Sequence, residues 1–476
     1  MVRKSCRSLI VASLCLLVAD TAASRAQPVT TKLDAEFERF IRKPAEPGEA
    51  RSRIITLRDS GLTTPSTPAD KAALDAMSQY FVYRITDPKY HAPAEPATAM
   101  ELKPRQPSQF VTQLFSEVRG YIHPLPGTDT TGWDPGRRAY AAEFGASLDK
   151  SITEILLDPK NPPAILREAA TRMLVVACES GAPAHWVTVL ALLSNPKIEP
   201  EVAYFALKAA ENLFGAYDLK RGWVHDVKGA LKPWVEPKIY VDLALAVEKF
   251  ALKPPPFLHR VADSTHKPGE AVNPATLTPG EVAVVRFYRV QALRALGQLK
   301  QDTIGGKATE EIRPIYTLAR FALSDPTIVP APSSKEYAEA VIGLCHVQPG
   351  TELLIEDVAI AVANGLKGFG LPRSGAVEED KTVLWKTTAE RFRIAMKNWN
   401  ENVAKVARFG AKQKDPVNTL VDAAMIGVID PLGKPAAGVG GRLDLTKIDG
   451  WLTKYKPATP DIALFKDSTV KIALPK

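Results

Sequence analysis

The sequence is poor in cysteine, has no long apolar run and shows almost no alternation of apolar with polar residues. Four cysteines in 476 residues exclude a small fold held together by disulfides. The longest apolar run, Leu9–Ala19, is too short to cross the roughly 30 Å of a bilayer core as a helix. The missing alternation argues against a β-sandwich or a barrel. These absences leave an all-α fold outside the membrane.

No catalytic, metal or cofactor signature is present. The seven histidines are scattered, and neither a His-Glu-x-x-His nor a Cys-x-x-Cys-His sequence occurs. Cys345-His346 lacks a second ligand cluster, which favours core packing over zinc. Ser147 and Lys150 have the spacing of a serine–lysine nucleophile without the elements that complete such a site. Glycines from Gly365 onward indicate a loop and not a phosphate site. We therefore expect no catalytic residue, no metal and no cofactor.

Residues 1–26 have the pattern of a secretory signal peptide. Arg3, Lys4 and Arg7 precede the apolar run, and Ser24-Arg25-Ala26 offers small residues for cleavage. The pattern predicts export to the periplasm or the exterior, with no transmembrane segment. Cleavage leaves Cys178 and Cys345, which we expect to be buried, unpaired thiols far apart in the fold.

The charge of the chain is close to balanced. Of 61 Lys and Arg residues and 53 Asp and Glu residues, the first 26 positions hold four and one, so the remainder carries +5. This mild excess argues against nucleic acid as a partner, because nucleic-acid binding needs concentrated positive charge. An anionic wall polymer stays open as a partner of such a chain.

A helical phrase recurs through the middle of the chain. Equivalent positions are Leu166, Val202 and Tyr288, each followed by alanines at helical spacing. The first two lie 36 residues apart; the third lies 86 further on, beyond the long loop Lys253–Gly280. Recurrence at a short period is typical of an α-solenoid, in which each repeat packs on its neighbours.

The phrase resembles the second helix of HEAT-type repeats, in which Val-Arg is followed by Ala-Ala and by Ala-Leu-Gly. Tyr288-Arg289 with Ala292 and Ala295-Leu296-Gly297 resembles it most closely. At Val202 the chain has Ala203 where the family prefers arginine. The resemblance implies a right-handed α-solenoid of HEAT-like hairpins over residues 137–365 and an interaction role, without naming a ligand.

The rest of the chain is divided around this array. Residues 27–136 read as an irregular, proline-rich N-terminal arm with short helices, and residues 366–476 as a helical C-terminal extension and tail. The sequence predicts helices over residues 33–41, 69–83, 110–118, 137–157, 164–178, 185–193, 200–214, 238–252, 281–299, 310–323, 335–347, 353–363, 382–409 and 417–429.

One segment is a candidate binding surface. Residues 215–237 connect two repeat helices and are longer than the usual turn. They combine aromatic and basic side chains at Tyr217, Arg221, Trp223, Lys232 and Trp234. Such side chains stack on sugars or anchor a protein partner. The alternative is a lid, in which the tryptophans fold back over apolar helices.

The sequence therefore predicts an exported, non-enzymatic scaffold or binding protein of the cell envelope. It would bind a protein partner through the surface of the helical array. Two alternatives remain open at this stage: a module for a wall polymer or polysaccharide that uses the loop 215–237, and an enzyme whose site has no recognisable motif.

Overall fold

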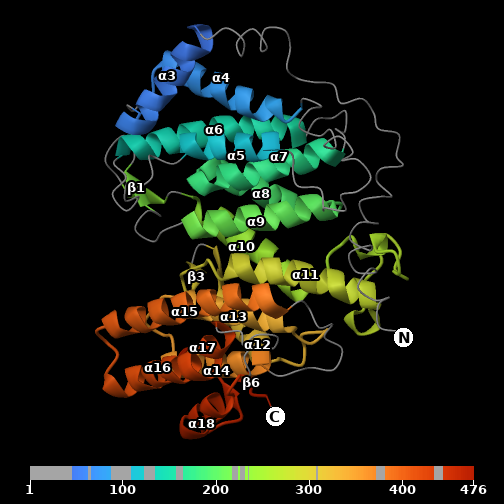
Figure 1. Ribbon diagram of the computed structural model, residues 1–476, viewed down its shortest axis with the longest axis vertical. Coiled ribbons are helices and arrows are strands. Elements are labelled where there is room, and N and C mark those ends of the chain that lie inside the picture. The colour runs from blue at the N-terminus through green and yellow to red at the C-terminus, as the bar shows by residue number, and fades with distance from the viewer. Residues whose placement is uncertain are drawn as a thin grey trace. The chain divides into compact units, whose positions relative to one another are not determined.

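Helices form nearly all of the regular structure in the described part of the chain (Figure 1). The computed structural model describes residues 45–62, 66–86, 109–122, 135–156, 164–216, 223–225, 231–233, 235–306, 309–370, 381–433 and 443–475. The contacts divide the chain into unit 1, residues 1–243, and unit 2, residues 244–476. The expected all-α class is confirmed.

The helices of unit 1 are stacked in two layers. In one layer α4 packs on α6 and α6 on α8; in the other α5 packs on α7 and α7 on α9. Neighbours in sequence, such as α6 and α7, also pack together. Its elements are α3 (Ala45–Ser60), α4 (Pro68–Arg84), α5 (Gln109–Ile122), α6 (Pro135–Leu156), α7 (Ala164–Ala177), α8 (Pro183–Ser194), α9 (Pro200–Ala216), β1 (Trp223–His225), β2 (Leu231–Pro233) and the start of α10 (Pro237–Leu252).

Unit 2 follows the same rule. The helices α11, α13 and α15 pack in succession in one layer, and α12, α14, α16 and α18 in the other. The elements are α11 (Pro279–Leu296), β3 (Ile304–Gly306), β4 (Thr309–Ile312), α12 (Pro314–Ala322), α13 (Ser334–His346), α14 (Ile355–Gly370), α15 (Lys381–Lys405), α16 (Ala411–Ala424), a π-helical turn (Met425–Ile429), α17 (Asp430–Gly433), α18 (Thr446–Lys454), β5 (Asp461–Ile462) and β6 (Ile472–Ala473). The strands form only two-stranded antiparallel pairs.

Side-chain caps fix where several helices begin. Thr278 accepts the backbone N–H of Glu281, whose carboxylate accepts the N–H of Thr278 in return. Ser333 and Glu336 form the same capping box on α13. Such boxes satisfy N–H groups that have no partner within the first turn. The sequence therefore sets the first residue of the two helices that form the centre of unit 2.

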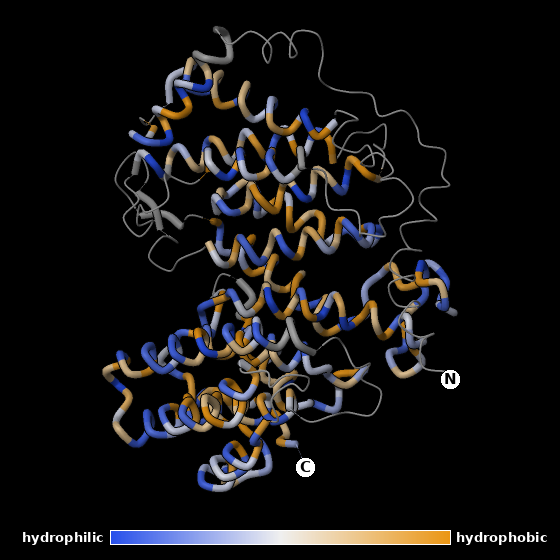
Figure 2. The backbone as a smooth tube through the Cα atoms, in the orientation of Figure 1, coloured by the Kyte–Doolittle hydropathy of each residue, from blue (hydrophilic) through white to orange (hydrophobic). Residues whose placement is uncertain are grey.

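The helices are amphipathic and bury their apolar sides. Figure 2 shows apolar and hydrophilic residues interleaved along the helices of both units. The repeated phrase lies in the core, since Ala170, Ala206 and Ala292 have no exposed surface. Small residues at these positions let neighbouring helices approach.

Glycines mark the closest helix contacts in unit 2. A Cβ atom on Gly343 would lie 3.0 Å from the Cα of Gly297, which joins α13 to α11. A Cβ on Gly365 would lie 2.5 Å from Val341, and one on Gly368 would overlap Tyr337. The prediction that a loop begins at Gly365 is therefore wrong. Helix α14 continues to Gly370, because these glycines make room for a neighbouring helix.

Two further helix boundaries differ from the expectation. The helix expected over 310–323 begins at Pro314, and residues 309–312 form β4 instead. Proline suits the first turn of a helix, where its missing N–H costs nothing. In the N-terminal arm, which was expected to be irregular, α3 forms a regular helix of 16 residues that begins at Ala45. The helix expected over 33–41 lies outside the described residues.

The two cysteines of the described residues, Cys178 and Cys345, are free and buried, as expected. Burial raises the pKa of both thiols, so the reactive thiolate is disfavoured. Both cysteines therefore pack in the core as unreactive thiols. Separately, none of the helices within the described ranges has the length and hydropathy required for a membrane span.

Candidate functional site

The aromatic and basic loop 215–237 is partly described. Its backbone forms the antiparallel pair β1 and β2, in which Trp223 lies opposite Pro233 and Val224 opposite Lys232. Tyr217, Arg221 and Trp234 lie outside the described residues, as do the side chains of Trp223 and Lys232. The hairpin places the first tryptophan near the end of the second strand. Its role in binding stays a prediction.

Thermal unfolding separates the two interpretations of this loop. If it is a binding surface, Trp223→Ala and Trp234→Ala should leave the melting temperature nearly unchanged and weaken partner binding by about 2 kcal/mol. Truncation of a buried lid would instead lower the free energy of unfolding by about 3–5 kcal/mol. Trp186→Ala is the matched control, because Trp186 is fully buried in the same unit. Losses equal to that control would assign the loop to packing.

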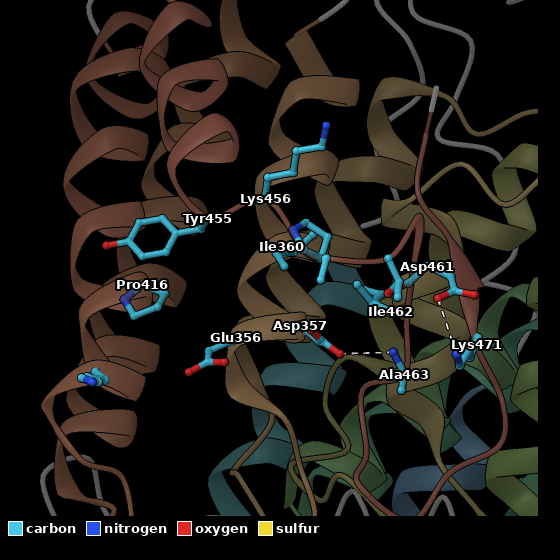
Figure 3. A pocket seen from close by; sticks show the side chains of 14 residues that line it. Glu356, Asp357, Ile360, Pro416, Tyr455, Lys456, Asp461, Ile462, Ala463 and Lys471 are labelled. Atoms are coloured by element: carbon cyan, nitrogen blue, oxygen red, sulfur yellow. Dashed lines mark hydrogen bonds and ion pairs between the residues drawn. The ribbon is translucent and has the colours of Figure 1, made fainter.

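A pocket lies in unit 2 between α14, α16 and the C-terminal segment (Figure 3). Its volume is about 540 Å³. The tail forms one wall because Leu354 donates its N–H to the Leu464 carbonyl and Lys466 donates to Glu352. Trp451 holds α18 on α16 through a hydrogen bond to the Pro416 carbonyl of 3.1 Å. The pocket is thus a product of tail docking.

Three of the six charged side chains that line the pocket have partners within the protein. Asp357 accepts the backbone N–H of Ala463 at 3.1 Å, and burial raises the pKa of this carboxyl group. Lys471 lies 3.8 Å from Asp461. In Figure 3 the Lys456 ammonium is directed away from Asp357. Asp357 therefore fastens the tail to α14, and the Asp461–Lys471 pair lies within the tail itself.

The lining contains no serine, cysteine or histidine. A Ser–His or Cys–His pair therefore cannot form among the residues that line this pocket. Its exposed Lys412 and Lys456 are suited to contacts with a polar or anionic ligand. The pocket can therefore bind such a ligand through the lysine amines at its exposed edge.

A buried imidazole–carboxylate pair lies in unit 1. His185 Nδ1 is 2.9 Å from Asp149 Oδ1, and Thr188 donates to Asp149 Oδ2 at 2.8 Å. The imidazole has no exposed surface, and its Nε2 atom has no hydrogen-bond partner among the described residues. A Cβ on Gly145 would lie 3.3 Å from that atom. The backbone of α6 thus seals the imidazole, and substrate has no access to it.

A second pair fastens the long loop Lys253–Gly280 to α11. Glu281 is fully buried and accepts hydrogen bonds from His266 Nδ1 at 2.7 Å, Ser264 Oγ at 2.5 Å and the Thr278 N–H at 2.8 Å. Burial raises the pKa of Glu281, but these hydrogen bonds outweigh it and hold the pKa below its ordinary value. The ionised carboxylate is therefore a structural anchor for the loop.

The depressed pKa of Glu281 predicts a pH dependence of stability. Its contribution is fully present above the pKa of the unfolded chain and is lost as the pH falls through the lower pKa of the folded chain. We expect the stability difference between wild type and Glu281→Gln to be largest above about pH 5 and to shrink toward about pH 3. Denaturant unfolding at several pH values measures it. A difference independent of pH would contradict the assignment.

The serine–lysine spacing on α6 does not produce a catalytic pair. Ser147 donates to Asp75 on α4 and is buried, while Lys150 is exposed. The hydroxyl thus connects two helices. Within the described ranges, no three His, Cys, Asp or Glu side chains are grouped so that they could hold a metal ion.

Comparisons with known proteins assign no relative. No family model matches the chain, and neither the curated proteins nor the solved structures contain a match.

Proposed function

We propose that this chain is an exported, non-enzymatic binding protein of the cell envelope. It acts through the surface of a right-handed α-solenoid of HEAT-like hairpins, with a protein partner as its main ligand. Export rests on the signal-peptide pattern of residues 1–26.

The observation that carries this proposal is the packing order of the helices. In both units a helix packs on the next helix and on the helix two places along, as in α5, α7 and α9. Such stacking is typical of repeat arrays, in which most contacts are between near neighbours and rows of side chains line the outer faces. A fold of this kind offers extended surface and is suited to macromolecular partners.

The chemistry of the described residues favours binding in the same way. The carboxylate–imidazole pairs at Asp149–His185 and His266–Glu281 are used for packing and for loop anchoring. The pocket beside Asp357 presents lysine amines and has no serine, cysteine or histidine in its lining. A binding role needs none of these groups to react.

Affinity capture tests the proposal. The protein beginning at residue 27 is immobilised, incubated with envelope extract and analysed by mass spectrometry, with the free protein as competitor. We expect at least one protein that is captured saturably and displaced by the competitor. Absence of any displaced protein would overturn the proposal. So would turnover in a panel of hydrolase and transferase substrates that Trp223→Ala or His266→Ala abolishes.

A further inference from the structure

Positive charge in unit 2 is concentrated in one layer. The helices α11, α13 and α15 carry ten Lys and Arg residues against five Asp and Glu residues. The opposite layer of α12, α14, α16 and α18 carries six against five. The first layer therefore contributes an excess as large as that of the whole chain after signal cleavage.

Two arginines of this layer share a single buried carboxylate. Glu339, on the middle helix α13, is only 4% exposed. Arg294 of α11 donates to its Oε1 atom at 2.8 Å, while Arg391 of α15 donates to Oε1 at 2.7 Å and to Oε2 at 2.6 Å. One buried carboxylate thus orients two guanidinium groups.

Both arginine side chains also reach solvent. The side chain of Arg294 is 37% exposed and that of Arg391 is 35% exposed. Glu339 lies beneath them and fixes their geometry, so little side-chain entropy would be lost when they bind an anion.

A second cationic point lies at the ends of α11 and α13. Gln348 donates its backbone N–H to the Lys300 carbonyl at 2.8 Å, which holds Lys300 beside the residues that follow His346. His346 in turn donates from Nδ1 to the Gly297 carbonyl at 2.9 Å. Burial lowers the pKa of His346, and the charges of Arg391 and Lys300 lower it further. The imidazole therefore senses the positive field of both cations.

The two points lie along the same helix face. Glu339 and His346 are separated by seven positions, or about two turns and roughly 10 Å along α13. Residues seven apart lie on nearly the same side of a helix. The arginine pair at Glu339 and the backbone of Lys300 near the end of α13 are thus about two helical turns apart along α13.

We propose that Arg294, Arg391 and Lys300 form a binding row for an anionic polysaccharide. This inference rests on the proposed binding role of the chain and adds a polymer ligand to the protein partner proposed above. A polymer with sulfate, phosphate or carboxylate groups at intervals engages both points of the row at once. The effective concentration of the second group then raises the affinity above that of a single anion. The expected export of the chain places it where envelope polysaccharides occur.

Paired charge variants of the full protein test the row. Arg294→Gln with Lys300→Gln removes two cations and leaves Glu339 with both hydrogen bonds from Arg391. Lys386→Gln with Lys397→Gln is the matched control, because it also removes two cations, both from exposed positions on α15. Binding is measured with dextran sulfate in a salt series, with neutral dextran and inorganic sulfate as comparisons.

We expect wild type to bind dextran sulfate and not neutral dextran. The row variant should weaken this binding by about tenfold and reduce its salt dependence, and the control by less than about threefold. Inorganic sulfate should compete only at far higher concentrations of sulfate groups. Equal losses in the two variants, equal competition by free sulfate or no binding by wild type would each overturn the row.

Two further measurements keep the result interpretable. Thermal melts check that both double variants fold, and Lys300→Gln alone replaces the row variant if it does not. Affinity capture from envelope extract is repeated with the row variant. Loss of dextran sulfate binding with capture of a protein partner unchanged confirms the row as a separate polymer site. Absence of polymer binding in wild type, with capture intact, overturns the row and leaves the proposed function standing.

Discussion

Glu336→Ala is expected to lower the free energy of unfolding by about 3–5 kcal/mol. Glu336 has no exposed surface, and Arg289, 3.7 Å away, is only 1% exposed. Removal of the carboxylate leaves the guanidinium buried without its counter-charge. It also removes the capping box that begins α13, since Ser333 then loses the acceptor of its N–H. Denaturant unfolding monitored by circular dichroism measures the effect.

Two companion variants separate the charge from the cap. Glu336→Gln keeps an acceptor for the Ser333 N–H and removes only the charge. Arg289→Met combined with Glu336→Met removes both charges, and we expect it to be more stable than Glu336→Ala. The pair is imperfectly satisfied, because Glu336 Oε1 and Arg289 Nε have no hydrogen-bond partner among the described residues. A loss below about 1 kcal/mol for Glu336→Ala would contradict the buried ion pair.

Local sequence signals were sufficient for most helices. Pro279 following Thr278, with Glu281 three residues after the cap, is a start signal that the structure uses for α11. The apolar spacing gave α7 and α9 nearly to the residue, because each helix buries one face. Signals of this kind depend on residues within one or two turns and need no knowledge of the neighbouring helices.

Glycine was the least reliable signal. Gly365 and Gly368 satisfied the ordinary pattern of a loop, yet both are helical. They are required by Val341 and Tyr337 on the adjacent helix, and that requirement depends on tertiary packing. The sequence alone does not distinguish a glycine that ends a helix from one that admits a neighbour.

The candidate sites show the same division. The clusters around Glu281 and Glu339 were not found from sequence. Arg294, Glu339 and Arg391 are separated by 45 and 52 positions, and no local pattern connects them. The loop 215–237 was found because its residues are contiguous. The sequence carries one signal for the Glu339 cluster, which is the unequal charge of alternate helices. That signal can be recognised only when the order of the helices in each layer is known.

Gly343→Val is expected to cost about 3 kcal/mol of unfolding free energy, at the upper end for overpacking. The Cα of Gly297 and two methyl groups of Leu318 would each lie 3.0 Å from the first added carbon. Gly297 ends the repeated phrase of α11, so the variant tests the contact between two successive helices of one layer. The Gly297 Cα cannot move away without separating α11 from α13, because it belongs to the backbone. Chemical denaturation with intrinsic fluorescence measures the loss.

Glycines that have space around them provide the control for that contact. Gly450 lies on α18 of the same unit, and a Cβ there would have no atom within 4 Å. Gly450→Ala should therefore stabilise the protein by about 0.5–1 kcal/mol through helix propensity, whereas Gly343→Ala should destabilise it. The two substitutions are chemically identical and both lie in helices, so a difference in sign isolates helix packing. Stabilisation by both would show that α11 and α13 do not approach at Gly343, and the layer order proposed for a HEAT-like array would lose its closest contact.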